Sequence, residues 1–218
     1  MRTIRITGKG NLKIHPDITR ITVTLTGIYK DYSETLLRSS EDTEKLKEML
    51  SLFGFKRTDP KTVDFSVDTE YESYRENNEY RQRFAGYRYR HVIKIEFDSD
   101  NDRLGKILGS LAKSELNPEF TISYTVKDSE AAKNSLLAKA VDDAKQKALV
   151  LTNAAGVALK DIVSVDYSRA ELNMEVRPMN RMVTLSKTSA AADNGLSMDI
   201  EPDDISVSDT VTIVWEIE

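Results

Sequence analysis

Hydrophobic and polar residues alternate along several stretches of the chain, as they do in β-strands that have one buried face. Isoleucine, valine and threonine dominate these stretches, and a β-branched composition favours strands. A His15-Pro16-Asp17 turn separates the first two stretches, so we expect them to pair as a β-hairpin. The alternation predicts strands over residues 3–14, 18–29, 63–74, 84–97, 120–126, 162–167 and 205–217.

The later strands predict a second hairpin and a buried C-terminal strand. Residues 63–74 and 84–97 flank a polar tip at residues 76–79, which is the pattern of a hairpin. The last strand puts Val211, Ile213 and Trp215 on one face. We expect that face to be buried, so that the C-terminal segment is an integral strand of the first sheet.

Three segments show the spacing of α-helices instead: residues 33–53, 100–114 and 129–155. Asp100 or Asp102 is placed to cap the second helix. The third helix is rich in alanine and is followed by Gly156, a residue type that ends helices. Its predicted apolar stripe consists of Leu137, Val141, Ala144, Ala148, Leu151 and Ala155.

Small residues indicate where two backbones come close together. The alanines of the third helix let another backbone approach it, so we expect this helix to lie tight against a sheet or a second helix. Gly8 and Gly10, within the first strand, indicate a bulge or a close backbone approach.

The order of these elements predicts an α+β fold, with mainly antiparallel sheets and helices packed on one face. We expect two sub-domains. Residues 58–126 form an inserted ββαβ sub-domain that is compatible with a ferredoxin-like arrangement. Residues 1–57 and 127–218 form a discontinuous α+β domain, completed by the C-terminal helix and strands. The small, polar run at residues 189–195 is predicted to be a loop.

Composition removes several classes of function. The 218 residues include no cysteine, which excludes disulfides, thiolate metal sites and cysteine nucleophiles. A net charge of −5 argues against a surface devoted to nucleic acid or anionic membranes. We expect no transmembrane helix, because no run of eighteen apolar residues occurs. No signal peptide is visible after Met1, so we expect a cytoplasmic protein, or a periplasmic or extracellular one if a leader was removed.

The sequence presents no catalytic, cofactor-binding or metal-binding residues. His15 lies in a turn and His91 in a hairpin strand, and neither has ligand-type residues near it in the pattern. No Gly-x-Ser-x-Gly motif occurs, and the acidic residues at 98, 100 and 102 lack the glycine and glutamate of a calcium loop. We therefore expect a non-enzymatic protein. A hydrolase whose carboxylates cannot be grouped from sequence is the alternative.

The second hairpin carries the candidate interaction surface. No acidic residue occurs between positions 81 and 91, where arginines alternate with aromatic residues. Arginine with exposed aromatics is typical of protein hot spots and of single-stranded nucleic acid binding. The plainer interpretation is a structural hairpin whose arginines pair with Asp68, Glu70 and Glu72 of the neighbouring strand, and this acidic strand disfavours nucleic acid. The candidate residues are Arg81, Arg83, Tyr87, Arg88, Tyr89 and Arg90.

A series of short motifs runs along most of the chain: Gly8-Lys9-Gly10, Pro16-Asp17, Gly86-Tyr87, Phe97, Phe120 with Asp128, residues 140–148, Gly156 and residues 204–211. In this order and spacing, these motifs resemble the SIMPL-domain family. Its members include the bacterial periplasmic immunogenic protein, proteins linked to oxidative-stress defence, and an animal protein that binds a pelle-like kinase. The chain departs from the pattern at Ser114-Glu115-Leu116-Asn117, where a Gly-Ala-Asn turn is expected.

The resemblance implies an α+β protein without known enzymatic activity, and some members look like subunits of large ring-like assemblies. We therefore expect a non-enzymatic interaction or assembly module that forms a homo-oligomer and needs no cofactor. We also expect that it can bind a protein partner. A stress-response or envelope-associated protein that acts through an oligomer is the alternative.

Overall fold

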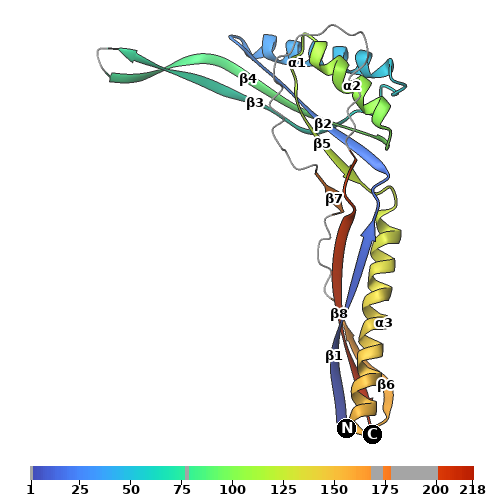
Figure 1. Cartoon of the computed structure of the whole chain (residues 1–218). Helices are drawn as coiled ribbons and strands as arrows, with labels where there is room; N and C mark the ends of the chain where they lie inside the picture. The colour runs from blue at the N-terminus through green and yellow to red at the C-terminus, as the bar shows by residue number, and fades with distance from the viewer. Residues whose placement is uncertain (1, 77–78, 168–173, 178–200) are drawn as a thin grey trace, which may run out of the picture. The chain divides into compact units, whose positions relative to one another are not determined.

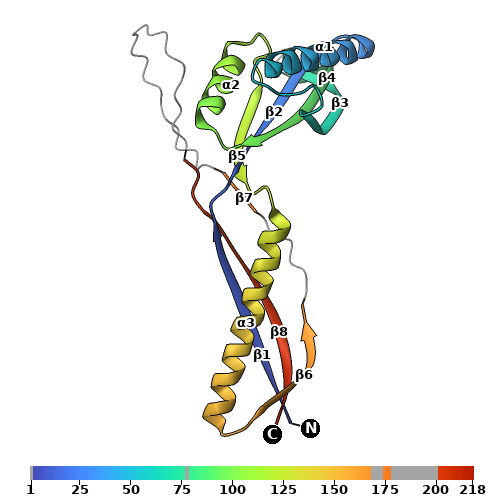
Figure 2. The same ribbon diagram turned by 90° about the vertical axis from the view of Figure 1, so that its right-hand side faces the viewer.

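The computed structural model describes residues 2–76, 79–167, 174–177 and 201–218 (Figures 1 and 2). Within these ranges the chain forms eight strands and three helices, and the strands make two antiparallel sheets. The predicted α+β class is therefore confirmed. The chain divides into two compact units, the first from residues 1–17, 124–176 and 202–218, and the second from residues 18–123 and 177–201.

The first unit is a three-stranded sheet with one long helix on it. The sheet has the order β1 (Arg2–Ile14), β8 (Ile205–Ile217) and β6 (Leu159–Asp166), and helix α3 (Ser129–Ala155) packs on β1 and β8. The C-terminal strand is central, which confirms that it is an integral strand. Its predicted inner face is also confirmed, because Trp215 is 4% exposed and Val211 and Ile213 are each 1% exposed.

Helix α3 and strand β1 touch through their backbones. A Cβ atom on Gly8 would lie 2.1 Å from the carbonyl oxygen of Ala140, and one on Gly10 would lie 2.2 Å from that of Leu136. Ordinary carbon–oxygen contacts need more than 3 Å, so only glycine fits at both positions. The predicted close approach is confirmed.

The predicted stripe of α3 is wrong in register. Its members Ala144 and Ala148 are buried, but Leu151 is 49% exposed. The buried positions recur every four residues. The reason is that the glycines of β1 contact the side of the helix with the smallest side chains, which is not its most hydrophobic side. The buried residues of the helix are Leu136, Ala140, Ala144, Ala148 and Thr152.

The second sheet has the order β3-β4-β2-β5-β7. Its strands are β2 (Ile18–Tyr29), β3 (Lys61–Glu76), β4 (Glu79–Asp98), β5 (Glu119–Thr125) and β7 (Glu175–Val176). Strands β3 and β4 confirm the predicted second hairpin, which is longer than the sequence indicated.

Two helices, α1 (Tyr32–Ser51) and α2 (Asn101–Lys113), cover one face of β2 and β4. Asp100 caps α2, because its carboxylate accepts a hydrogen bond of 2.9 Å from the Arg103 N–H, as predicted. The core between sheet and helices includes Ile21, Val23, Leu25, Leu46, Leu50, Ile93, Ile95, Leu104, Ile107 and Leu111.

The predicted hairpin of the first two strands is wrong. Strand β1 pairs with β8, whereas β2 pairs with β4 in the other sheet. The Asp17 N–H donates to the Thr125 carbonyl, and the Asp17 carboxylate accepts from the Lys127 N–H, so the turn residues bind a different segment instead of reversing the chain.

The units also differ from the predicted sub-domains. Residues 18–57 lie with residues 58–123, so the compact units divide after Asp17 rather than after residue 57. The apolar residues of β2 and α1 share one core with β4 and α2, which is why this segment belongs there. The predicted loop at residues 189–195 lies outside the described residues.

Replacing Gly8 by alanine should destabilise the first unit by about 3 kcal/mol or more, because β1 or α3 must move to make room for one methyl group. The matched control is Lys13→Ala, at an exposed position of the same strand, which should change stability by less than about 0.5 kcal/mol. Urea unfolding measures both, and equal midpoints for the two variants would contradict the close packing described for Gly8.

Trp215→Ala should cost about 3–5 kcal/mol of unfolding free energy, since a buried indole is replaced by a cavity. Thermal unfolding followed by circular dichroism measures the loss. An unchanged midpoint would show that the indole contributes nothing to the core.

Candidate interaction surface

Strand β4 changes partners along its length. From Tyr87 to Lys94 it pairs with both β2 and β3, and beyond Lys94 it pairs with β2. From Glu79 to Gly86 its only partner among the described strands is β3. Residues 70–76 and 79–86 therefore form a two-stranded ribbon beyond the end of β2. In Figure 1 this ribbon extends past the helices of its own unit.

A β-bulge marks the start of the ribbon. Glu70 faces Gly86 and Tyr71 faces Phe84, so Ala85 has no partner in β3. Gly86 has φ +150°, and a Cβ atom there would lie 2.4 Å from the carbonyl oxygen of Tyr29. The bulge adds one residue to β4 and so changes which residues of the strand face each side.

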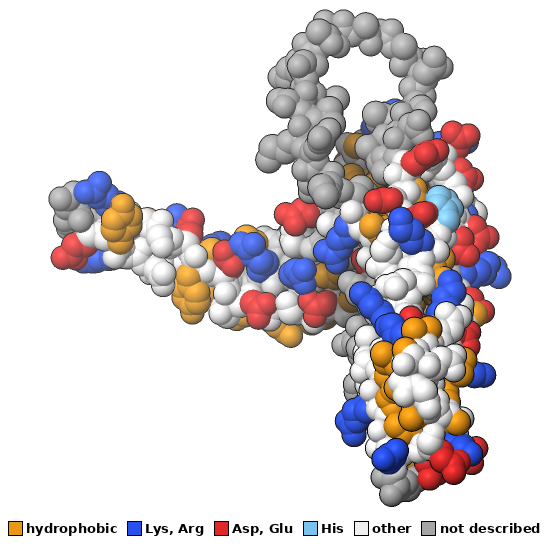
Figure 3. All heavy atoms as spheres, turned by 60° about the horizontal axis from the view of Figure 1, so that its bottom comes forward, with side chains coloured by type: hydrophobic (Ala, Val, Ile, Leu, Met, Phe, Trp, Pro, Cys, Tyr) orange, Lys and Arg blue, Asp and Glu red, His pale blue; other side chains and the backbone are white. Residues whose placement is uncertain are grey.

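The arginines of the predicted surface are paired with the acidic strand β3. Arg88 makes two hydrogen bonds to Glu70, of 3.0 and 2.6 Å, and Arg83 binds Glu72 at 2.6 Å. Glu70 and Glu72 are two of the partners expected for a structural hairpin. Asp68 was expected as well, but the structure pairs Arg90 with Asp64 instead, at 2.6 Å. Figure 3 shows basic and acidic side chains interspersed along the hairpin.

Arg81 lies near the tip, with its guanidinium 3.8 Å from the Glu79 carboxylate. The guanidinium of Arg83 also lies over the Tyr74 ring, 5.6 Å from its centroid. Side chains along a strand point to alternate sides. Tyr71 and Phe84 therefore lie on one side of the ribbon, and their neighbours Glu72, Tyr74, Arg81 and Arg83 lie on the other. We call this second side the charged face.

Tyr89 is not part of any surface, which corrects its inclusion among the candidates. Its side chain is 1% exposed in the core under α1, and its hydroxyl donates a hydrogen bond of 2.6 Å to the Asp42 carboxylate. Burial, reinforced by that carboxylate, raises the pKa of Tyr89 well above its usual range. The phenol therefore stays neutral and serves the packing of α1 on the sheet.

Tyr87 belongs to a row of aromatic rings that continues from helix α1 onto the ribbon. Its ring makes edge-to-face contacts with Tyr32 of α1 and Phe84, at centroid distances of 5.4 and 5.3 Å, and Phe84 contacts Tyr71 at 6.0 Å. Tyr80, four residues before Phe84 on the same strand, lies on the same side of the ribbon. These five residues are called the aromatic row below.

The aromatic row is open to solvent. Tyr32 is 52% exposed, Tyr71 55%, Phe84 41% and Tyr80 81%. The sequence-based list contained only Tyr87 of these five. Tyr71 and Phe84 face each other across the hairpin, a relation that depends on the register of β3 and β4 and on the bulge.

The histidines have structural surroundings. The His91 ring nitrogens lie 2.9 Å from the Thr43 hydroxyl and 2.8 Å from the Thr62 hydroxyl, while exposed His15 lies 3.4 Å from the Asp204 carboxylate. Burial, with a smaller effect from Lys47, lowers the pKa of His91. Within the described ranges, no three His, Asp or Glu side chains are grouped to hold a metal ion.

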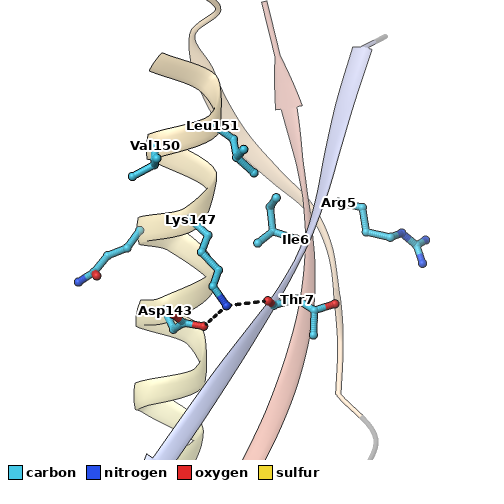
Figure 4. A pocket seen from close by; sticks show the side chains of 8 residues that line it. Arg5, Ile6, Thr7, Asp143, Lys147, Val150 and Leu151 are labelled. Atoms are coloured by element: carbon cyan, nitrogen blue, oxygen red, sulfur yellow. Dashed lines mark hydrogen bonds and ion pairs between the residues drawn. The ribbon is translucent and has the colours of Figure 1, made fainter. Parts of the chain in front are cut away.

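A groove of about 550 Å³ lies between β1 and α3 in the first unit (Figure 4). Its central charges are already paired: Asp143 lies 2.7 Å from Lys147 and also accepts the Lys9 N–H at 2.7 Å. Lys147, followed by that N–H, lowers the pKa of Asp143. The Lys147 ammonium also donates to the Thr7 carbonyl at 3.5 Å, so these side chains bind the outer edge of β1.

Comparison with known proteins identifies the family. A family model described as SIMPL, protein of unknown function (DUF541), matches residues 4–215. The chain belongs to the SIMPL family. Two relatives are 26 kDa periplasmic immunogenic proteins, one from Brucella melitensis and one from Brucella abortus. Each is 24% identical over 217 residues, which cover 99% of this chain and 84% of the relative.

The family match spans both units, so the ribbon lies within the matched region of this SIMPL protein. Of the helices in the described parts of the chain, none has the length and apolar character needed to cross a membrane.

The pKa of His91 predicts a pH dependence. Because the folded-state pKa is below the ordinary value of 6.5, the fold favours the neutral ring, and stability should fall as the pH drops through and below 6.5. His91→Gln, which keeps hydrogen-bonding groups near both threonines, should reduce this loss between about pH 7 and pH 5. Urea unfolding at each pH tests this. Parallel pH curves for wild type and His91→Gln would contradict it.

Proposed function

We propose that this SIMPL protein is a non-enzymatic interaction module that self-associates through the aromatic row of its β3–β4 ribbon. The observation that carries the proposal is the row itself, in which four rings are 41–81% exposed. Contiguous apolar groups on a protein surface are typical of binding sites, and tyrosine is enriched among the residues that dominate interfaces.

The stability of the ribbon supports a partner. A two-stranded hairpin is marginally stable in water unless a further strand or another surface covers it. The part of β4 that pairs with β2 has such cover, because α1 and α2 pack on it, but the described residues provide none for Tyr71, Tyr80 and Phe84. A second protein surface on the aromatic row would supply it.

The charged face is the less favourable side for binding energy. Arg83, Arg88 and Arg90 already pair with carboxylates of the same hairpin. Pairs exposed to this degree contribute about 0–1 kcal/mol each, and a partner would have to displace or desolvate them. We therefore assign these pairs to holding β3 against β4, and the aromatic row to association.

The relatives favour a place of action outside the cytoplasm. Both are named periplasmic, and this chain matches 84% of their length. The periplasmic alternative is therefore the one we propose, together with an envelope-associated role exercised through an oligomer. The hydrolase alternative has no specific observation in its favour.

The double variant Tyr71→Ser with Phe84→Ser should be monomeric at concentrations where the wild type self-associates, because it removes the centre of the aromatic row. Size-exclusion chromatography with light scattering measures the mass. The matched control is Tyr74→Ser, which removes a tyrosine from the charged face of the same ribbon and should leave the mass unchanged.

Circular dichroism and the thermal midpoint of the core establish that the variants are folded. Two results would contradict the proposal: a wild-type mass for the folded double variant, or an equal loss of association in Tyr74→Ser.

A further inference from the structure

The outer edge of β1 has backbone groups that are open for pairing. Among the described strands β1 pairs only with β8, so its other side is an edge of the sheet. The Lys9 N–H and the Thr7 carbonyl point to that edge, because they bind side chains of α3. Alternate residues of an antiparallel strand direct their backbone groups to the same side, so those of Arg5 and Thr3 face the edge as well. No described residue binds the backbone groups of Arg5 and Thr3.

Helix α3 changes character along this edge. Beside residues 7–9 it presents Asp143 and Lys147, whose side chains bind the edge of the strand. Its next turn presents Val150 and Leu151, which have no hydrogen-bonding side chains and are 67% and 49% exposed. The helix therefore satisfies the edge at residues 7–9 and leaves the preceding part of β1 open.

The open part of the edge is one wall of the groove in Figure 4, where Ile6 and Leu151 point into the space between β1 and α3 and Arg5 points away from the helix. The groove volume of about 550 Å³ is within the range of roughly 300–1,000 Å³ found for binding clefts. A strand edge beside an apolar groove is suited to an extended peptide. The edge supplies backbone hydrogen bonds, and the groove takes every second side chain.

The side of β1 that is turned away from α3 is basic. Arg5, Lys9 and Lys13 lie on this side and are exposed, and within the described ranges their side chains form no ion pair. The residues of β8 that face the same way are uncharged from 206 to 214, and Glu216 follows at the end, opposite residue 3. A strand added at the edge would place alternate side chains on this basic side, where acidic residues are favoured.

We propose that the first unit binds an extended segment of another protein as a fourth strand, antiparallel to β1 along residues 3–7. Its apolar side chains enter the groove, and the acidic side chains between them lie on the basic side next to Arg5. The residue opposite Arg5 exchanges two backbone hydrogen bonds with it, because the Arg5 backbone groups face the edge. This inference goes beyond the proposed function, since it concerns another partner and the unit that lacks the aromatic row.

The probe is a fluorescein-labelled peptide, Thr-Val-Glu-Val-Glu-Val-Thr, and fluorescence anisotropy measures its binding to the full chain. A peptide with lysine in place of both glutamates should bind at least about tenfold more weakly, because its charges repel the basic side. N-methylation of both glutamate amides should abolish binding, since these N–H groups face β1. N-methylation of the first and last valine amides, which face away from β1, should leave the affinity within about threefold.

Leu151→Asp should weaken binding of the probe at least about tenfold, because a carboxylate replaces an apolar wall of the groove. The matched control is Leu149→Asp, at a 41% exposed leucine of the same helix that does not line the groove, and it should bind as the wild type does.

Arg5→Glu should weaken binding of the glutamate peptide and strengthen that of the lysine peptide, each by about tenfold. The control Lys13→Glu, at the other end of the basic side, should change neither affinity. Circular dichroism and the thermal midpoint establish that all four variants are folded.

Three results would overturn the inference: no saturable binding of the probe, undiminished binding of the peptide methylated at its glutamates, or equal affinities in Leu151→Asp and Leu149→Asp. The variant Tyr71→Ser with Phe84→Ser should bind the probe as the wild type does. A failure of the proposed self-association is therefore distinguishable from a failure of the peptide site.

Discussion

The bulge at Ala85 and Gly86 is the feature on which the organisation of the second unit depends. Gly86 adopts φ +150° and lies so close to the Tyr29 carbonyl that a Cβ atom would be only 2.4 Å away. At this point β2 ends and β4 continues with β3 alone. The bulge also keeps the aromatic rings on one side: Tyr87 and Phe84 are three residues apart, an odd spacing that regular alternation would place on opposite faces, yet their rings touch. A larger side chain at position 86 would disturb both the end of β2 and the continuity of the row.

The two faces of the hairpin then have separate physical roles. Ion pairs between β3 and β4 lie on one face, where they set which residues face each other but add little to stability because they are exposed. The rings of the other face are more exposed to water than those of the core. Covering them with a partner surface would therefore gain hydrophobic free energy. In the first unit, by contrast, β1 and α3 approach so closely at Gly8 and Gly10 that a Cβ atom would not fit there, and Asp143 and Lys147 bind the outer edge of β1.

Local patterns were enough to predict most elements but not their partners. Alternation and helical spacing located the strands, the three helices, the cap at Asp100 and the burial of Trp215, because each depends on residues close together in the sequence. The pairing of β1 with β8 joins residues about 200 positions apart, and the short turn at residues 15–17 gave a misleading local signal for pairing β1 with β2. The stripe of α3 was misplaced because the sequence shows which residues are apolar, not which side of the helix the glycines of β1 will contact.

The candidate surface shows the same limit. Glu70 and Glu72 could be predicted as partners of the hairpin arginines, since they lie on a neighbouring strand of opposite charge, but Asp64 could not. The burial of Tyr89 was missed because alternating aromatic residues do not reveal which face a helix will cover. Tyr32 and Tyr71 were missed because their contacts with the hairpin aromatics require a bulge that shifts the register by one residue and a helix end that arrives from outside the hairpin.

The central claim is that a second protein surface covers the aromatic row and not the charged face. Hydroxyl-radical footprinting with mass spectrometry tests it on the unmodified chain, because Tyr71 and Tyr80 lie on one side of the ribbon and Tyr74 on the other. Raising the protein concentration from the monomeric to the associated range should reduce the labelling of Tyr71 and Tyr80 and leave that of Tyr74 unchanged. Unchanged labelling of Tyr71 and Tyr80 in the associated protein, or protection of Tyr74 alone, would contradict the account.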